Sequence, residues 1–189
     1  MTGIVASVWA KNEAIEQARG IHDVESVVSE ITIARGESDQ ATADEIAKRV
    51  RRYVFYTIFD DVSGTVSDGT VTLRGRVTMP YKAQEIAELA SRVHGVQDVI
   101  NEIGTLPVST FDEQLRYVIA AGIYRDPLFW NYAIQVNPPI HVVVEHGRVT
   151  LTGVVHSEIE RRKAEIIARS AFGAFSVDNQ LRTDRTGGE

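Results

Sequence analysis

Basic residues gather with aromatic residues in one stretch of the sequence. Lys48, Arg51 and Arg52 fall at spacings of three and four residues, which place them on one face of a helix. Aromatic side chains including Tyr56 follow directly. Cations beside aromatic rings suit the anionic headgroups of a lipid surface. The alternative is an ordinary solvated face on a helix whose other face lies in the core. The stretch therefore predicts a lipid- or partner-binding surface, with that alternative open.

A second stretch concentrates apolar and aromatic side chains. Leu128, Phe129, Trp130 and Tyr132 lie within five positions of one another. Such a cluster could dip into a membrane interface or hold a protein partner. The alternative is that the segment covers the core of its own domain. Both interpretations predict that these four side chains make contacts, either with a lipid or protein partner or with the core of their own domain.

Residues suited to catalysis or metal binding do not form a recognisable set. The chain has no cysteine, and its five histidines include no pair spaced as metal ligands on a helix. The sequence also lacks a serine elbow and a glycine-rich phosphate loop. The basic run from Arg161 to Lys163 is surrounded by glutamates and predicts a salt-bridged helix surface. We expect no enzyme activity, no cofactor and no metal.

Composition sets further bounds on the partners. The 189 residues include 43% hydrophobic and 24% charged residues, which is normal for a globular protein. The net charge of −6 argues against a nucleic-acid partner, because nucleic-acid binding requires a basic excess. No apolar run approaches the length of about 18 residues that a membrane-spanning helix needs. The first residues lack the basic start and apolar stretch of a signal peptide.

An internal repeat organises these stretches. Three segments align without gaps, with matching glycines at Gly3, Gly75 and Gly153. The segments cover residues 1–31, 73–103 and 151–181. Each predicts a strand, a helix with an apolar stripe, and a second strand.

The second and third copies also have a front half. The patterns Thr42-x-x-Glu45 and Thr110-x-x-Glu113 resemble capping boxes that begin a helix. A predicted helix after Thr42 would place Ile46, Val50, Tyr53, Val54 and Ile58 on one face. Tight turns at residues 67–70 and 145–148 then predict β-hairpins.

The expected fold class is α+β, built from tandem αββαβ modules. Each module is a three-stranded mixed sheet with two helices on one face. The predicted boundaries are a partial repeat at 1–36, a module at 41–106, and a module at 109–184. The last module carries ten extra residues, because its capping pattern lies 68 residues after that of the second copy whereas its glycine lies 78 residues after. The extra residues fall within 124–139.

The motifs resemble the BON domain family. The resemblance rests on the V-T-L-x-G-x-V pattern at 71–77 and 149–155, with the final-strand segments 95–101 and 177–179. It implies a non-enzymatic binding module of the bacterial envelope, placed in the periplasm. It also implies a phospholipid surface or an envelope protein as the partner. The alternative function is a protein–protein scaffold or self-assembly module that works through repeat contacts.

The first copy lacks its front helix and strand. Two explanations stay open: the native chain begins upstream of Met1, or another chain supplies the missing half. An upstream start would also explain the absence of a signal peptide. The sequence therefore leaves two forms open, a truncated periplasmic chain or a cytoplasmic protein. A half unit exposes a sheet edge and an apolar helix face, and both invite pairing. The second explanation predicts a homo-oligomer formed through the first half repeat.

Overall fold

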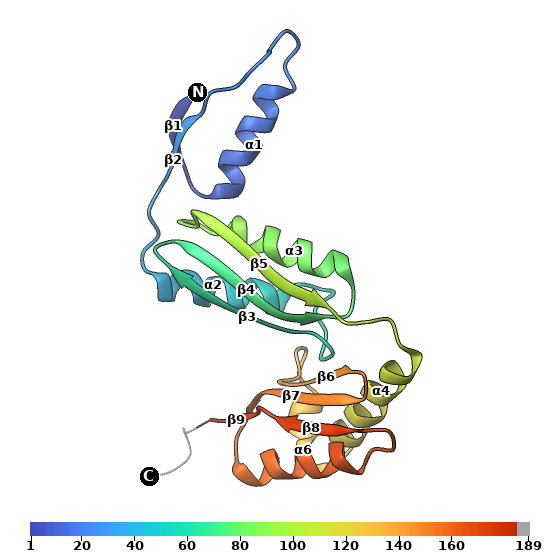
Figure 1. The fold of residues 1–189 in the computed structure, drawn as a ribbon. Coiled ribbons are helices and arrows are strands. Elements are labelled where there is room, and N and C mark those ends of the chain that lie inside the picture. The colour runs from blue at the N-terminus through green and yellow to red at the C-terminus, as the bar shows by residue number, and fades with distance from the viewer. Residues whose placement is uncertain (185–189) are drawn as a thin grey trace. The chain divides into compact units, whose positions relative to one another are not determined.

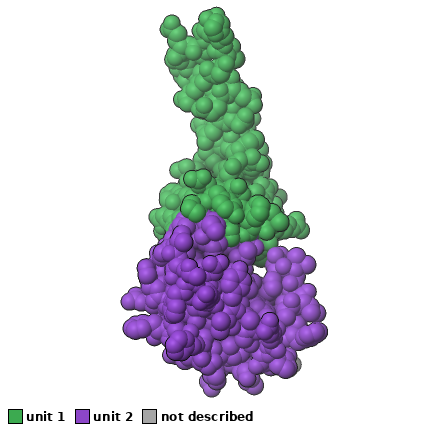
Figure 2. Space-filling model, turned by 90° about the vertical axis from the view of Figure 1, so that its right-hand side faces the viewer, with its two compact units in different colours: residues 1–55, 62–75, 80–104 green, residues 56–61, 76–79, 105–189 purple. Residues whose placement is uncertain are grey.

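The computed structural model describes residues 1–184, which form two compact units. Figure 2 colours the two units separately. The first unit contains residues 1–55, 62–75 and 80–104, and the second contains residues 56–61, 76–79 and 105–184.

The first unit holds the partial repeat and most of the second copy. The partial repeat is a strand, a helix and a parallel strand: β1 (Thr2–Val5), α1 (Val8–Arg19) and β2 (Glu30–Ile33). The second copy follows with the elements α2 (Asp39–Arg52), β3 (Asp61–Ser67), β4 (Thr70–Val77), α3 (Pro80–Ser91) and β5 (Asp98–Thr105). Its strands form a sheet in the order β3-β4-β5 (Figure 1).

The third copy forms the bulk of the second unit. Its elements are α4 (Thr110–Tyr124), the 3-10 turn η1 (Pro127–Phe129), α5 (Trp130–Ala133), β6 (Ile140–Glu145), β7 (Arg148–Val155), α6 (Glu158–Ser170), β8 (Ser176–Asn179) and β9 (Arg182–Thr183). Strand β7 is central, antiparallel to β6 and parallel to β8 and β9. Helices α4 and α6 lie on the same side of this sheet (Figure 1). The expected α+β class with tandem modules is confirmed.

Both hairpin turns have the backbone that the sequence predicted. Asp68 and Gly69 have φ values of 51° and 76°, and His146 and Gly147 have 53° and 72°. Two consecutive positive φ values match the twist of the flanking strands in a two-residue hairpin.

An aspartate near the start of each front helix holds the hairpin turn of its module. The Asp39 carboxylate accepts hydrogen bonds from the backbone N–H groups of Asp68 and Gly69, at 2.9 and 3.2 Å. The buried Asp112 carboxylate accepts the equivalent bonds from His146 and Gly147, both at 2.8 Å. These bonds fix the hairpin turn against the helix N-terminus.

The predicted capping boxes at Thr42 and Thr110 are wrong. Ser38 and Ser109 are the N-cap residues, because their hydroxyl oxygens accept the N–H groups of Ala41 and Asp112. Helix α2 therefore begins before Thr42. Thr42 is a residue of the helix itself, and its side chain is buried. A capping box does occur at α6, where Ser157 pairs with Glu160.

The predicted helical face beyond Arg52 is also wrong. Helix α2 ends at Arg52 because Tyr53 adopts an extended backbone conformation, with φ −67° and ψ 119°. Ile46 and Val50 are buried as expected, whereas Val54 is 81% exposed.

The core of the third module is apolar on the helix-facing side of the hairpin. Strand residues Val142, Val144, Val149 and Leu151 are almost fully buried. Each such side chain contributes about 1.5–3 kcal/mol through removal of apolar surface from water. Leu115, Ile119 and Ile123 of α4 and Ala164 and Ala168 of α6 pack into the same core.

The partial repeat packs on the second copy within the first unit. The N–H of Val8 donates to the carbonyl of Val96 at 2.9 Å, and the N–H of Gly95 donates to the carbonyl of Ala6 at 2.8 Å. The Arg92 guanidinium lies 4.4 Å from the centre of the Trp9 ring, a cation–π contact. These contacts join residues 1–36 to the second copy as one folded body.

Candidate surface-binding site

Helix α2 ends in a group of cations. Arg51 and Arg52 are exposed, and no acidic group among residues 1–184 lies within ion-pair distance of either guanidinium. Lys48 is also exposed and lies 3.7 Å from one carboxylate oxygen of Glu45, while Arg49 contacts the other oxygen at 3.0 Å. The Arg49 hydrogen bond lowers the pKa of Glu45. Cations also stabilise a helix C-terminus through the helix dipole, so the placement serves the fold as well.

Exposed aromatic and apolar side chains follow these cations. Val54 is 81% exposed, Phe55 51% and Tyr81 42%. The Phe55 ring lies edge-on to Tyr53 and to Tyr81, with ring centres 5.7 and 5.9 Å apart. The Tyr53 hydroxyl donates to the Glu85 carboxylate of α3. We name Lys48, Arg51, Arg52, Val54, Phe55 and Tyr81 the basic–aromatic surface.

Tyr56, which the sequence predicts as a binding residue beside these cations, is half-buried. It lies in the second unit, where its ring centre is 5.5 Å from that of His141. Phe55 and Tyr81 are exposed aromatic side chains of the first unit, and the Tyr56 assignment stays a prediction. Phe55 is predictable as a member of the surface because it follows the cations in sequence. Tyr81 is distant in sequence, and only the fold brings its ring next to Phe55.

The predicted aromatic segment divides into a buried pair and an exposed pair. Phe129 and Tyr132 are 0% and 2% exposed and belong to the core of the third module. Their assignment as surface contacts is therefore corrected: a lipid or partner cannot reach these rings in the folded chain. Leu128 and Trp130 are 41% and 66% exposed and stay available.

Tyr132 secures the start of helix α6. Its hydroxyl donates to the Glu160 carboxylate at 2.8 Å and accepts the N–H of His156 at 2.8 Å. Its ring stacks on the His156 ring. Burial, together with the Glu160 carboxylate, raises the pKa of Tyr132 to about 12. The extra residues of the third copy thus serve its own fold at this position.

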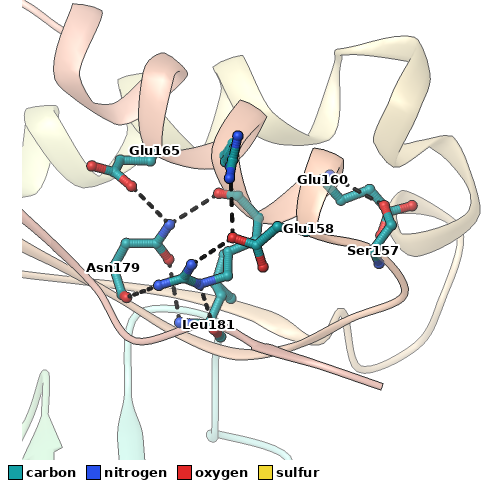
Figure 3. A network of polar contacts seen from close by, with 8 residues as sticks. Ser157, Glu158, Glu160, Glu165, Asn179 and Leu181 are labelled. Carbon is teal, nitrogen blue, oxygen red and sulfur yellow. Dashed lines mark hydrogen bonds and ion pairs between the residues drawn. The ribbon is translucent and has the colours of Figure 1, made fainter. Parts of the chain in front are cut away.

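A polar network joins helix α6 to the last strands (Figure 3). The Asn179 amide donates to the carbonyl of Arg161 at 3.0 Å and accepts the N–H of Leu181 at 3.2 Å. The Arg161 guanidinium binds the Glu158 carboxylate at 2.7 Å and the Leu181 carbonyl at 3.0 Å. The salt-bridged surface predicted for this helix is present.

The same asparagine bonds recur in the second copy. Asn101 donates to the carbonyl of Ala83 at 3.0 Å and accepts the N–H of Ile103 at 3.2 Å. Every partner lies 78 residues before its counterpart in the third copy. In the first copy Ser29 takes this position, and its hydroxyl accepts the N–H of Ile31 at 3.4 Å. Asn101 and Asn179 occupy the same repeat position, and this shared position is the one sign of their role in the sequence.

The described part of the chain, residues 1–184, carries neither a metal-binding cluster nor a membrane-spanning helix. No group of three histidines, cysteines or acids there is placed to hold a metal ion. No helix within residues 1–184 has the length and apolarity to cross a bilayer.

A known family model matches most of the chain, in three segments. The BON domain model matches three segments, residues 1–35, 38–107 and 130–185. A relative, osmotically-inducible protein Y of Escherichia coli (strain K12), is 30% identical over 132 residues. That match covers 65% of this chain and 62% of the relative, so it spans about three fifths of the relative's length.

Solved structures give weaker likenesses. Two structures of CdsD, a structural protein of the type III secretion system of Chlamydia trachomatis, share 15% and 18% sequence identity with this chain. They cover 97% and 98% of this chain and 83% and 81% of their own. Their TM-scores of 0.31 and 0.30 are too low to support a structural argument.

Proposed function

The chain belongs to the BON domain family, and from this membership we propose that it binds anionic phospholipid surfaces through its basic–aromatic surface. The proposal places the protein in the bacterial envelope, on its periplasmic side, as a non-catalytic module. Family membership and the similarity to osmotically-inducible protein Y support an envelope-related module of this kind. Leu128 and Trp130 form a second candidate contact within the same proposal.

The observation that carries the proposal is the pairing of free cations with exposed apolar side chains. Arg51 and Arg52 are exposed and have no ion-pair partner within the described residues 1–184, and Val54 and Phe55 follow them at 81% and 51% exposure. A cation near an anionic leaflet contributes about 1 kcal/mol. Burial of a valine or phenylalanine side chain contributes about 1.5–3 kcal/mol when complete. Together these contributions give reversible binding.

Charge makes this binding sensitive to salt. The chain carries a net charge of −6, which an anionic surface repels, while the cations of α2 attract it locally. The Debye length falls from about 10 Å at 0.1 M salt to about 3 Å at 1 M. We therefore expect binding to weaken strongly as the salt concentration rises.

Charge reversal at the basic–aromatic surface tests the proposal. We expect the Arg51→Glu/Arg52→Glu variant to bind phosphatidylglycerol-containing vesicles at least about tenfold more weakly than the unmodified chain, because each reversal exchanges attraction for repulsion. Co-sedimentation with these vesicles, and with phosphatidylcholine vesicles for comparison, measures the effect.

The matched control is Arg162→Glu/Lys163→Glu, which changes the net charge equally on helix α6. Arg162 is 76% exposed and Lys163 43% exposed, so these substitutions leave the core intact. If both variants lost vesicle binding equally, net charge alone would explain the loss, and this would contradict a specific binding surface. Absence of binding by the unmodified chain would refute the lipid proposal.

A further inference from the structure

Three phenylalanines stand exposed at one end of the third module. Phe111 is 52% exposed, Phe172 98% and Phe175 82%. Large aromatic side chains are rarely so exposed in groups unless they serve a contact. We name these three residues the phenylalanine tip.

Glycine contacts bring the tip together from three segments. A Cβ atom on Gly173 would lie 2.5 Å from the Phe111 ring, so this ring rests on the glycine. A Cβ atom on Gly147 would lie 3.5 Å from the Cβ of Phe175. The N–H of Phe175 also donates to the carbonyl of Gly147 at 2.8 Å. The helix start, the hairpin turn and the loop after α6 therefore form one patch.

The fold itself does not require phenylalanine at these positions. In the second copy His94 and Gln97 occupy the repeat positions of Phe172 and Phe175 and complete the same loop. That loop is also a contact surface, because Gly95 packs against the backbone of Gly36 in the partial repeat. This repeat position thus already serves as a joint between repeats once in the chain.

The glycine of the corresponding loop has a different packing partner in the third copy. In the second copy, Gly95 packs against the backbone of Gly36. In the third copy, the equivalent glycine, Gly173, packs against the ring of Phe111. The third copy's loop therefore cannot receive a backbone segment in the same way. It presents rings instead, which pair with other rings in offset or edge-to-face arrangements.

We propose that the phenylalanine tip is the contact through which two copies of this chain associate. Phenylalanine side chains bury about 150–250 Å² each, so the exposed fractions leave roughly 350–580 Å² per tip. Two tips facing each other across a twofold axis bury at most about 700–1,200 Å², which is the size of weak, transient interfaces. The association is therefore a weak, concentration-dependent dimer, closed by its symmetry.

Charges at the tip favour a second copy over an anionic membrane. One exposed acid, Glu113, follows Phe111, and one exposed base, Arg148, follows Gly147. This balanced pair gives no net attraction to anionic lipid. A twofold contact can place the acid of one copy opposite the base of the other.

Sedimentation velocity over a series of protein concentrations tests the proposal on the full chain. We expect the sedimentation coefficient of the unmodified chain to rise with concentration. In the Phe172→His/Phe175→Gln variant we expect association at least about tenfold weaker. The substitutions install the second copy's own residues at exposed positions, so we expect the fold to be preserved, and the circular dichroism spectrum of the variant verifies it.

The control variant is Ile159→Gln, which removes an apolar side chain that is 72% exposed on helix α6 of the same module. It should associate like the unmodified chain. A monomer at every concentration, or equal association by the tip variant, would overturn the proposal. Loss of binding to phosphatidylcholine vesicles by the tip variant, with a monomeric unmodified chain, would assign the tip to membrane and also overturn it. The Arg51→Glu/Arg52→Glu variant should still dimerise, which separates this proposal from the lipid proposal.

Discussion

Gly153→Ala is expected to destabilise the second unit by at least about 3 kcal/mol and to lower its Tm by more than about 10 °C. Gly153 has a φ of 117°, which side chains rarely adopt. A Cβ atom there would lie 1.8 Å from the carbonyl oxygen of Pro139, at the entry to β6. Backbone must therefore move in the strand pair that forms the core. Thermal unfolding followed by Trp130 fluorescence in a Trp9→Phe background measures this loss.

Gly3→Ala is the matched control, because Gly3 occupies the same repeat position. Its φ is also positive, at 153°, but no heavy atom lies within 4 Å of the added Cβ. We expect a loss of about 1 kcal/mol from backbone strain alone. Trp9 fluorescence in a Trp130→Phe background reports on the first unit. Equal losses in the two variants would show that strain, rather than the contact with Pro139, determines the requirement for glycine.

Gly95→Ala is expected to detach the partial repeat from the second copy. Gly95 has a φ of 84°, and an added Cβ would lie 2.3 Å from both the N and Cα atoms of Gly36. The left-handed conformation alone costs about 1–2 kcal/mol for a residue with a side chain. The added methyl group forces Gly36 away from position 95. We expect this movement to break the hydrogen bond from residue 95 to Ala6 and to separate Trp9 from Arg92.

Acrylamide quenching of Trp9 in a Trp130→Phe background measures this detachment. The quenching constant should rise in Gly95→Ala and stay unchanged in Gly20→Ala. Gly20 lies in the same repeat with a φ of −74°, and its nearest atoms are 3.6 Å from an added Cβ. Unchanged quenching in Gly95→Ala would contradict the packing of the repeats through this glycine.

Local sequence patterns predicted the repeat, the strands and both hairpin turns. Asp68-Gly69 and His146-Gly147 identify their turns without outside help, because the preference for positive φ is a property of the residues themselves. Sequence alone did not distinguish the cap positions, because serine and threonine, here Ser38 and Thr42, both act as N-cap residues. Only the packing of Thr42 into the module excludes it.

Side-chain roles that depend on distant partners could not be predicted. Phe129 and Trp130 are neighbours of similar character, yet one is fully buried and the other 66% exposed, because only one faces the core. Tyr81 reaches Phe55 through the packing of α2 and α3, and the sequence gives no sign of this pairing. Phe172 is an apolar residue near a helix end and would ordinarily be assigned to the core.

The most direct test of lipid binding reports on the basic–aromatic surface itself. The chain has no cysteine, so a single cysteine introduced by Val54→Cys can be labelled uniquely with an environment-sensitive fluorophore. We predict a blue shift and a gain in emission when phosphatidylglycerol vesicles are added, reversed by high salt. The same label at Val28→Cys, a position 75% exposed in the partial repeat, should not respond. Vesicle binding without any change at position 54 would contradict the proposed surface.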